Sequence, residues 1–348
     1  MVRIIKGRAP LRVDLAGAWS DIPFYSDLYG GKTINAAINI YVNGEIRFEK
    51  DGSFDFKYGL HFPSGSGLGS SGALNVLYYA IINYENFLEK KLTKEDVALG
   101  AYYIERALGA KCGKQDQCAA AYGGISRFYF GSQKTQYNLR GEAKEQHIIK
   151  HQKVTKENLE KELSNRLLLI NTKIIHSSSA IIHDIQNQFE NDMCNFSLSS
   201  SNGKIKKCIR NMADSTYDLS KNLINFNMDN ISQKTNEFIG KNIELTPHYF
   251  NTDWEKVGEI ISYQFDMMKE MSLKTTNPII EKIIKKINPY IYGAKPGGAG
   301  GGGCIICLCK SAEHLEDLKG FLEEDEFLSQ FDCYNVIIDN DGIQVWET

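Results

Sequence analysis

The sequence contains no apolar run long enough to cross a membrane. No segment of the 348 residues approaches the roughly 18 consecutive apolar side chains that a spanning helix needs. The first residues, MVRIIKGRAPLRVDLAG, also lack the long apolar core of a signal peptide. We therefore expect a globular protein of the cytoplasm that does not bind membranes.

Cysteine and net charge are scarce as well. The 8 cysteines are not spaced as a disulfide framework, which is typical of a reducing compartment. Cys304 and Cys307 have CxxC spacing in CIICLC, but a second ligand pair is missing, so core packing is favoured over metal or redox chemistry. The formal net charge of -3 provides no basic field for nucleic acid or an anionic membrane. A small-molecule partner is therefore expected, and a homodimer is left open.

The apolar residues follow both strand and helix periods. Alternation in LRVDLAG and AINIYVNGEIRF predicts strands between residues 3 and 48, and NRLLLINTKII (165–175) and CIICLC predict two more. The last two strands are predicted to form a hairpin at NDG (340–342). Helical patterns cover residues 73–87, 93–108, 200–287 and 311–324.

These elements predict an α+β protein. The chain is long enough for two domains, and the pattern places a boundary near residues 160–180. We therefore divide the chain into residues 1–165 and 166–348. In the second predicted helix, Thr93 of TKED is expected to be the N-cap.

The run PSGSGLGSSGA (63–73) directly precedes the first predicted helix. Backbone N–H groups at a helix N-terminus attract an anion, and glycines let the backbone approach phosphate oxygens. Ser70 and Ser71 add hydroxyls that suit a phosphate or a Mg²⁺ shell. The run matches neither GxxxxGK[ST] nor GxGxxG with a distant acidic residue, so by itself it slightly favours a structural turn.

Four other segments, in this order, change this interpretation: PLRVDLAGAWSDIP, GGKTINAAIN, GKQDQCAAAYGG and AKPGGAGGGGCIICLC. Together they resemble the GHMP small-molecule kinases, the superfamily of galactokinase, homoserine kinase, mevalonate kinase and phosphomevalonate kinase. The resemblance implies an N-terminal domain with a left-handed βαβ crossover, a ferredoxin-like C-terminal domain and an active site in the cleft between them. It also implies ATP and Mg²⁺ as cofactors.

The resemblance assigns roles to individual residues. Asp116 would be the general base, or else only a helix N-cap, and Arg12 would lie near the transferred phosphate, or else form a structural ion pair. Glu105 would bind Mg²⁺ with Ser70 or Ser71, the alternative being a surface ion pair. The loop around the ATP phosphates would contain Pro63, Ser64, Gly65, Ser66, Gly67, Leu68, Gly69, Ser70, Ser71 and Gly72.

The acceptor is harder to assign. GAWSDIP and the segment ending in GAGGGG look like L-fucokinases, whereas GKQDQCAAAYGG is closer to D-glycero-D-manno-heptose 7-phosphate kinases; both phosphorylate an anomeric sugar hydroxyl. A galactokinase-like enzyme and a non-catalytic binding protein of the same fold are the remaining alternatives. The implied substrate residues are Trp19, Ser20, Asp21, Gly123, Thr172, His176, Gly298, Ala299 and Gly300.

Three features of the sequence bear on the assignment of the family and the acceptor. Trp19 is as well explained by packing as by contact with a sugar face. His176 stands where the family has an arginine, which favours an acceptor without a phosphate if that arginine serves an anionic group. Only about a dozen residues separate Phe48 from Pro63, so the hairpins that the family usually has there are shortened.

Overall fold

The structure is a computed structural model that describes residues 3–63, 65–137, 143–175, 177–194, 203–224 and 252–348. The first part contains β1 (Arg3–Ala16), α1 (Pro23–Tyr29), β2 (Gly31–Phe48), β3 (Phe54–Leu60), α2 (Ser70–Ile82), α3 (Tyr84–Leu88), α4 (Lys94–Ala107), α5 (Gln115–Tyr122), β4 (Ile125–Tyr137), β5 (Ala143–Lys153) and α6 (Leu159–Ser164). The second contains β6 (Leu167–Asn171), α7 (Ser178–Cys194), α8 (Lys204–Ile224), α9 (Trp254–Met271), η2 (Leu273–Thr275), α10 (Pro278–Ile287), η3 (Asn288–Tyr290), β7 (Ile291–Pro296), β8 (Cys304–Cys309), α11 (Ala312–Glu324), β9 (Asp332–Asn335) and β10 (Gln344–Glu347).

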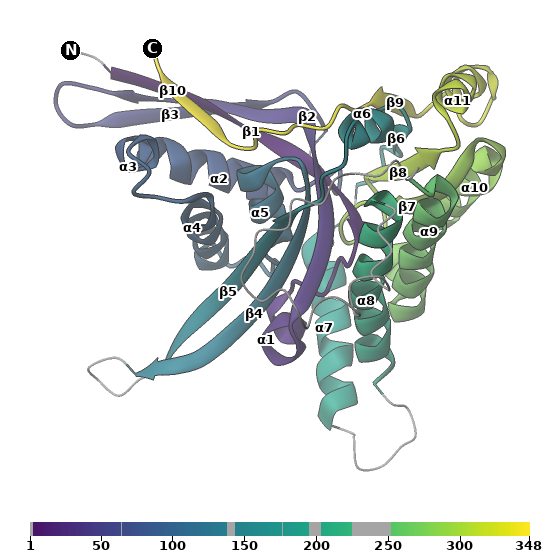
Figure 1. Cartoon of the computed structure of the whole chain (residues 1–348), viewed down its shortest axis with the longest axis horizontal. Helices are drawn as coiled ribbons and strands as arrows, with labels where there is room; N and C mark the ends of the chain where they lie inside the picture. Colours follow the sequence, from purple (N-terminus) through teal and green to yellow (C-terminus); the bar gives the residue numbers. More distant parts are fainter. Residues whose placement is uncertain (1–2, 64, 138–142, 176, 195–202, 225–251) are drawn as a thin grey trace, which may run out of the picture.

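The first sheet has the strand order β10-β1-β2-β4-β5, and β3 also pairs with β2 (Figure 1). Residues 31–36 of β2 pair with β4, and residues 42–48 pair with β3, in both cases antiparallel. Strands β3 and β4 therefore run parallel to each other and are connected through α2–α5, as a βαβ unit requires. The left-handedness of this crossover stays a prediction.

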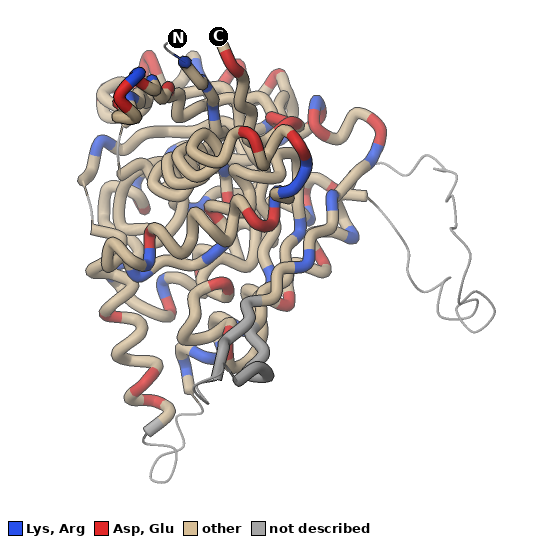
Figure 2. The backbone as a smooth tube through the Cα atoms, turned by 90° about the vertical axis from the view of Figure 1, so that its left-hand side faces the viewer, with Lys and Arg blue, Asp and Glu red and all other residues tan. Residues whose placement is uncertain are grey.

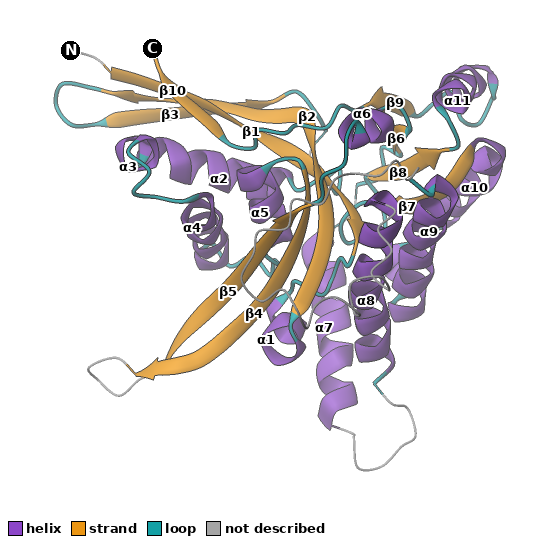
Figure 3. Ribbon diagram, viewed as in Figure 1, coloured by secondary structure: helices purple, strands orange, loops and turns teal. Residues whose placement is uncertain are grey.

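Helices α2, α4 and α5 lie on one side of this sheet (Figure 3). Leu77 of α2 is fully buried in the same apolar cluster as Leu11 and Ile46 of the strands. The start of α4 is fixed by its sequence: the Thr93 side chain accepts a hydrogen bond from the Asp96 N–H, and the Asp96 carboxylate accepts one from Thr93 N–H. This capping box confirms the predicted N-cap.

The second sheet has the order β7-β8-β6-β9, with every neighbouring pair antiparallel. The connections β6–helices–β7 and β8–α11–β9 give the split βαβ arrangement of a ferredoxin-like domain, as predicted.

CIICLC is β8, and all six of its residues are buried. Burial raises the pKa of the Cys304 thiol to about 12, so this cysteine is a packing residue in its protonated form.

The predicted C-terminal hairpin is wrong. Strand β9 belongs to the second sheet, whereas β10 returns to the first sheet and pairs with β1, which brings the two chain ends together (Figure 1). The segment between these strands is drawn into the first core, where Val336 and Ile338 are buried. NDG reports a local bend, but burial decides which sheet the next strand joins. The division at residue 165 stays a proposal, with this last strand crossing back.

Charged residues of both signs are distributed along the described chain (Figure 2). Within those residues, no helix is both long and apolar enough to cross a membrane. The cytoplasmic location stays a prediction.

Candidate active site

A cavity of about 340 Å³ opens where the two halves of the structure meet. Its wall is formed by the end of β1 and the loop after it, the glycine loop before α2, the α4–α5 loop, the start of α7 and the 298–299 turn. The predicted site residues that line it are Arg12, Trp19, Asp21, Gly65, Gly67, Gly69, Ser70, Ser71, Glu105, Asp116, Gly298 and Ala299.

The glycine loop is held in a conformation that favours glycine. Gly65, Gly67 and Gly69 have φ values of 71°, 76° and 76°. Gly67 also lies against the second glycine run: a Cβ there would come within 2.5 Å of the Gly297 carbonyl oxygen. Helix α2 starts after Gly69 without a side-chain cap, so its first N–H groups remain available to an anion in the cavity.

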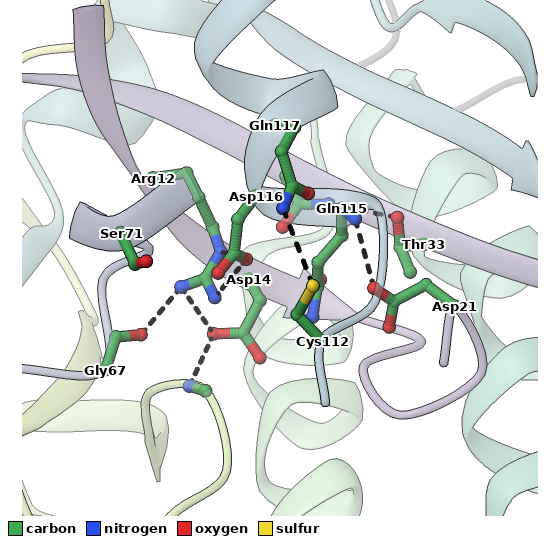
Figure 4. Close-up of polar contacts among 12 residues, drawn as sticks. Arg12, Asp14, Asp21, Thr33, Gly67, Ser71, Cys112, Gln115, Asp116 and Gln117 are labelled. Carbon is green, nitrogen blue, oxygen red and sulfur yellow. Dashed lines mark hydrogen bonds and ion pairs between the residues drawn. The ribbon is translucent and has the colours of Figure 1, made fainter. Parts of the chain in front are cut away.

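Asp116 and Arg12 form an ion pair at the cavity (Figure 4). Arg12 donates from Nε and Nη2 to Asp116 Oδ1, at 2.9 and 2.6 Å, and from Nη1 to the Gly67 carbonyl at 2.7 Å. Burial opposes the guanidinium charge, but Asp116 and Asp14 outweigh it and raise the Arg12 pKa. The buried cation therefore stays charged and fixes one carboxylate oxygen of Asp116.

Asp14 and Lys295 were not singled out from the sequence. Both side chains are completely buried, and Lys295 of β7 donates to Asp14 of β1. Asp14 also accepts from the Gly298 N–H at 3.2 Å and lies 3.6 Å from Arg12 Nη1. The available signal was a charged residue inside each buried strand, in RVDLAG and in GAKPGG, since such residues are rarely buried without a partner.

Glu105 projects from the last turns of α4. Its Oε1 accepts from Ser71 Oγ at 2.7 Å and its Oε2 from Gln117 Nε2 at 2.6 Å. Burial raises the Glu105 pKa. Ser70 lines the cavity beside Ser71, so a carboxylate and two hydroxyls, all oxygen groups that Mg²⁺ accepts, gather at the start of α2.

Three of the residues that line the cavity each have a buried polar atom without a hydrogen-bond partner among the described residues. These atoms are Trp19 Nε1, Asp21 Oδ1 and Gln115 Oε1. The other oxygen of Asp21 accepts from the Gln115 N–H at 3.0 Å, and burial raises the Asp21 pKa to about 6. Trp19 has a φ of 74°, which is rare for a bulky residue. The residues that line the cavity thus include one donor and two acceptors that are buried without a partner among the described residues.

Four predicted substrate residues do not line this cavity. Ser20 donates to the Gly17 and Lys32 carbonyls, and Thr172 donates to the Gly303 carbonyl. Gly123 packs against the Gly342 backbone, and Gly300 packs against Thr275. Their contacts are those of residues that shape the surrounding loops.

The remaining loop residues flank the cavity. Ser66 and Leu68 are buried, and the Leu68 carbonyl accepts from the Arg12 N–H at 3.0 Å. Gly72 faces Asp116 so closely that a Cβ would come within 2.6 Å of the Asp116 Cβ, and Pro63 is exposed. Ser64 and His176 lie outside the described residues.

Lys114, next to the predicted base, is another residue that the sequence did not reveal as important. It is completely buried, with Nζ 3.8 Å from Asp27 Oδ1 and 5.0 Å from the centre of the Tyr102 ring. Its place in GKQDQ was the only available signal. It anchors the start of α5, the helix that carries Asp116.

An uncapped helix N-terminus, an arginine-held carboxylate and a second carboxylate beside serine hydroxyls are groups that phosphoryl transfer to a small molecule can use. Comparisons with known proteins agree. The family model "GHMP kinases N terminal domain" matches residues 32–124, and "GHMP kinases C terminal" matches residues 243–326. The chain belongs to the GHMP kinases, and it is therefore an ATP-dependent kinase.

Three individual relatives show low sequence identity to the chain. The chain is 25% identical to the D-glycero-alpha-D-manno-heptose 7-phosphate kinase of Campylobacter jejuni, with 99% of each chain covered. It is 22% identical to the L-fucokinase/L-fucose-1-P guanylyltransferase of Bacteroides fragilis, but spans only 38% of that protein. The crystal structure of a D-glycero-D-manno-heptose 1-phosphate kinase from Bacteriodes thetaiotaomicron superposes with a TM-score of 0.62 at 19% identity, covering 99% of both chains.

Proposed function

We propose that the chain is an ATP-dependent carbohydrate kinase that transfers the γ-phosphoryl group to the anomeric C1 hydroxyl of a sugar. The observation that carries the proposal is the position of Asp116. Its carboxylate lies beside the glycine loop and the N-terminus of α2, and Arg12 holds it there. A base is thus fixed next to a phosphate site, as in-line transfer requires.

In this mechanism, the N–H groups at the start of α2 bind phosphate oxygens of ATP. Asp116 accepts the proton of the attacking hydroxyl through the oxygen that Arg12 leaves free, and the Arg12 guanidinium offsets negative charge near the transferred group. Glu105 with Ser70 or Ser71 would hold Mg²⁺, which neutralises charge on the phosphates when bound. Phosphate oxygens and water would complete its coordination.

Trp19, Asp21 and Gln115 would bind the sugar. One N–H donor and two oxygen acceptors suit neighbouring hydroxyl groups, each of which can donate and accept. Such a wall favours a neutral sugar, and L-fucose is the acceptor that GAWSDIP indicates.

A second candidate is a D-glycero-D-manno-heptose 7-phosphate. The full-length similarity to a heptose 7-phosphate kinase favours it, and Lys111 on the cavity wall offers a cation for the second phosphate. The two candidates differ in whether the acceptor already carries a phosphate.

A coupled ADP-release assay over L-fucose, galactose, mannose and D-glycero-D-manno-heptose 7-phosphate tests the proposal. We expect turnover of one acceptor, with NMR of the product placing the new phosphate on C1. Phosphate at another hydroxyl would rule out the anomeric assignment. No turnover of any sugar, despite ATP binding, would favour the non-catalytic binding protein.

A further inference from the structure

Arg127 is a buried cation that has no anionic partner in the part of the chain that the structure describes. It lies on β4, and only 9% of its surface is exposed. Its Nε is buried without a hydrogen-bond partner, and no carboxylate of the described residues lies within ion-pair distance of the guanidinium. Its neighbours are two rings, Tyr129 at 4.8 Å and Tyr217 at 6.0 Å from their centroids. A buried arginine is normally paired, so this one lacks the group that would compensate its charge.

Arg127 is a lining residue of a cavity of about 470 Å³ between the β4–β5 pair and the C-terminal end of α8. This cavity shares no lining residue with the proposed active site. Its described lining residues include no Asp or Glu: Arg127, Tyr129, Gln152, Lys153, Val154, Thr155, Tyr217, Ser220, Lys221 and Ile224.

Two cationic side chains can reach a ligand in this cavity. Lys221, on α8, lines it together with Arg127 of β4. Lys153 also lines the cavity, but in the strand register it is opposite Ser126, the neighbour of Arg127, and its side chain lies against Gly124. Because neighbouring strand residues point to opposite faces, the Lys153 side chain is on the other face of the sheet from Arg127. The usable charge is therefore that of Arg127 and Lys221.

We propose that this cavity is a second binding site, for a small molecule that carries a phosphate monoester. A guanidinium offers a planar set of donors that matches a phosphate in two-point contact. Two cations balance a dianion, and the tyrosine rings and the Gln152 and Thr155 side chains are available to the rest of the molecule. The volume falls within the range of small-ligand sites. A bound ligand would connect the first sheet to α8.

Isothermal titration calorimetry on the full chain saturated with Mg-ADP tests this site, because the ADP occupies the phosphate loop. Glycerol 3-phosphate is the probe, and malonate is the dicarboxylate comparison. We expect one equivalent of glycerol 3-phosphate to bind the wild type, and Arg127→Gln to weaken that binding by at least about tenfold. Lys221→Gln should weaken it less, because a lysine makes only a point-charge contact.

Lys161→Gln is the matched control, since this exposed lysine lies on α6 outside the cavity. The site is overturned if Arg127→Gln binds glycerol 3-phosphate with unchanged affinity, or if the wild type does not bind it at roughly 10 mM. The phosphate assignment is overturned if malonate binds as tightly as glycerol 3-phosphate. If Arg127→Gln does not fold, Lys221→Gln and Tyr217→Ala decide the matter. None of these readouts needs kinase turnover, so they stand apart from the proposed function.

Discussion

Asp116 and Arg12 act as a pair. Arg12 is nearly inaccessible to solvent, whereas the Asp116 side chain keeps 31% of its surface exposed to the cavity. The pair therefore has a buried side and an exposed side. Arg12 holds one carboxylate oxygen of Asp116, and the other is the oxygen that we propose accepts the proton of the substrate hydroxyl.

Asp116→Asn should abolish transfer and retain ATP binding. The amide has nearly the same shape but cannot accept the hydroxyl proton, so kcat is expected to fall by at least about 100-fold. ATP affinity, measured by calorimetry without sugar, should change by less than about threefold. Turnover at the wild-type rate would remove Asp116 as the base.

We expect Asp21 to make the stability of the protein depend on pH. Burial raises its pKa from 3.8 to about 6, so the folded state holds the proton more tightly than the unfolded chain. Its contribution is fully present below about pH 4 and is lost as the pH rises through about 6.

Asp21→Asn removes this loss. The variant should gain on the wild type in free energy of unfolding between pH 4 and 7, by roughly 3 kcal/mol at the upper end. Urea unfolding of both proteins across this range measures the difference. A difference in free energy of unfolding that does not vary with pH would contradict the raised pKa of Asp21. A higher KM for the sugar in the variant would separately support the proposed contact between Asp21 and the sugar.

At the scale of elements, the glycine loop before α2 is held in place by contact with the second glycine run. Gly67 packs against Gly297 of the segment between β7 and β8, so the loop before α2 is positioned by the other half of the chain. Gly65 has nearly the same φ, but a Cβ at Gly65 would meet no atom of the described residues within 4 Å.

Gly67→Ala should therefore weaken ATP binding much more than Gly65→Ala. Both substitutions carry the cost of an alanine at positive φ, about 1 kcal/mol. Only Gly67→Ala adds a collision with a backbone carbonyl, and we expect a further loss in ATP affinity of at least about tenfold. Calorimetry with ATP compares the two variants, and equal losses would show that the contact with Gly297 does not position the loop.

At the scale of the whole molecule, the Asp14–Lys295 ion pair connects the two sheets. β1 and β7 contribute one partner each, and the same carboxylate contacts Arg12 and the 298 turn. Because both groups are buried, loss of one partner leaves an uncompensated charge in the core.

Lys295→Met should lower the free energy of unfolding by about 3 kcal/mol or more. The double variant Asp14→Asn with Lys295→Met should lose less than the two single losses added together, because neither charge is then left alone. Urea unfolding of the four proteins gives this coupling. Strictly additive losses would show that the pair does not join the sheets energetically.

Much of the fold could be predicted because its signals are local. Thr93 with Asp96, the apolar strand CIICLC and the glycines before α2 each act on neighbours in the chain. The pairing of the last strand with β1 was missed, since NDG describes a bend and not the partner of the strand that follows.

The site shows the same difference. Resemblance picked out Asp116, Arg12, Glu105 and the phosphate loop, and the structure gathers them around one cavity. Ser20 lies in the same segment as Arg12, and Thr172 was also assigned to the substrate, but their hydroxyls donate to backbone carbonyls and neither residue lines the cavity. A motif identifies a segment, and only the fold decides which of its side chains face the ligand.

By itself, the sequence determined the α+β class, the helices α2, α4 and α8–α11, the strands β1, β2, β6 and β8, and the family, because periodicity, caps and motifs act over short stretches of chain. It did not predict the strands β3, β4, β5 and β7. Tertiary structure alone decided that β10 joins β1, that Lys295 meets Asp14, and that Arg127 is buried with no carboxylate of the described residues beside it. The physical reason is that burial and ion pairing depend on contacts between residues far apart in the chain, and no local pattern records which partner each charge will have.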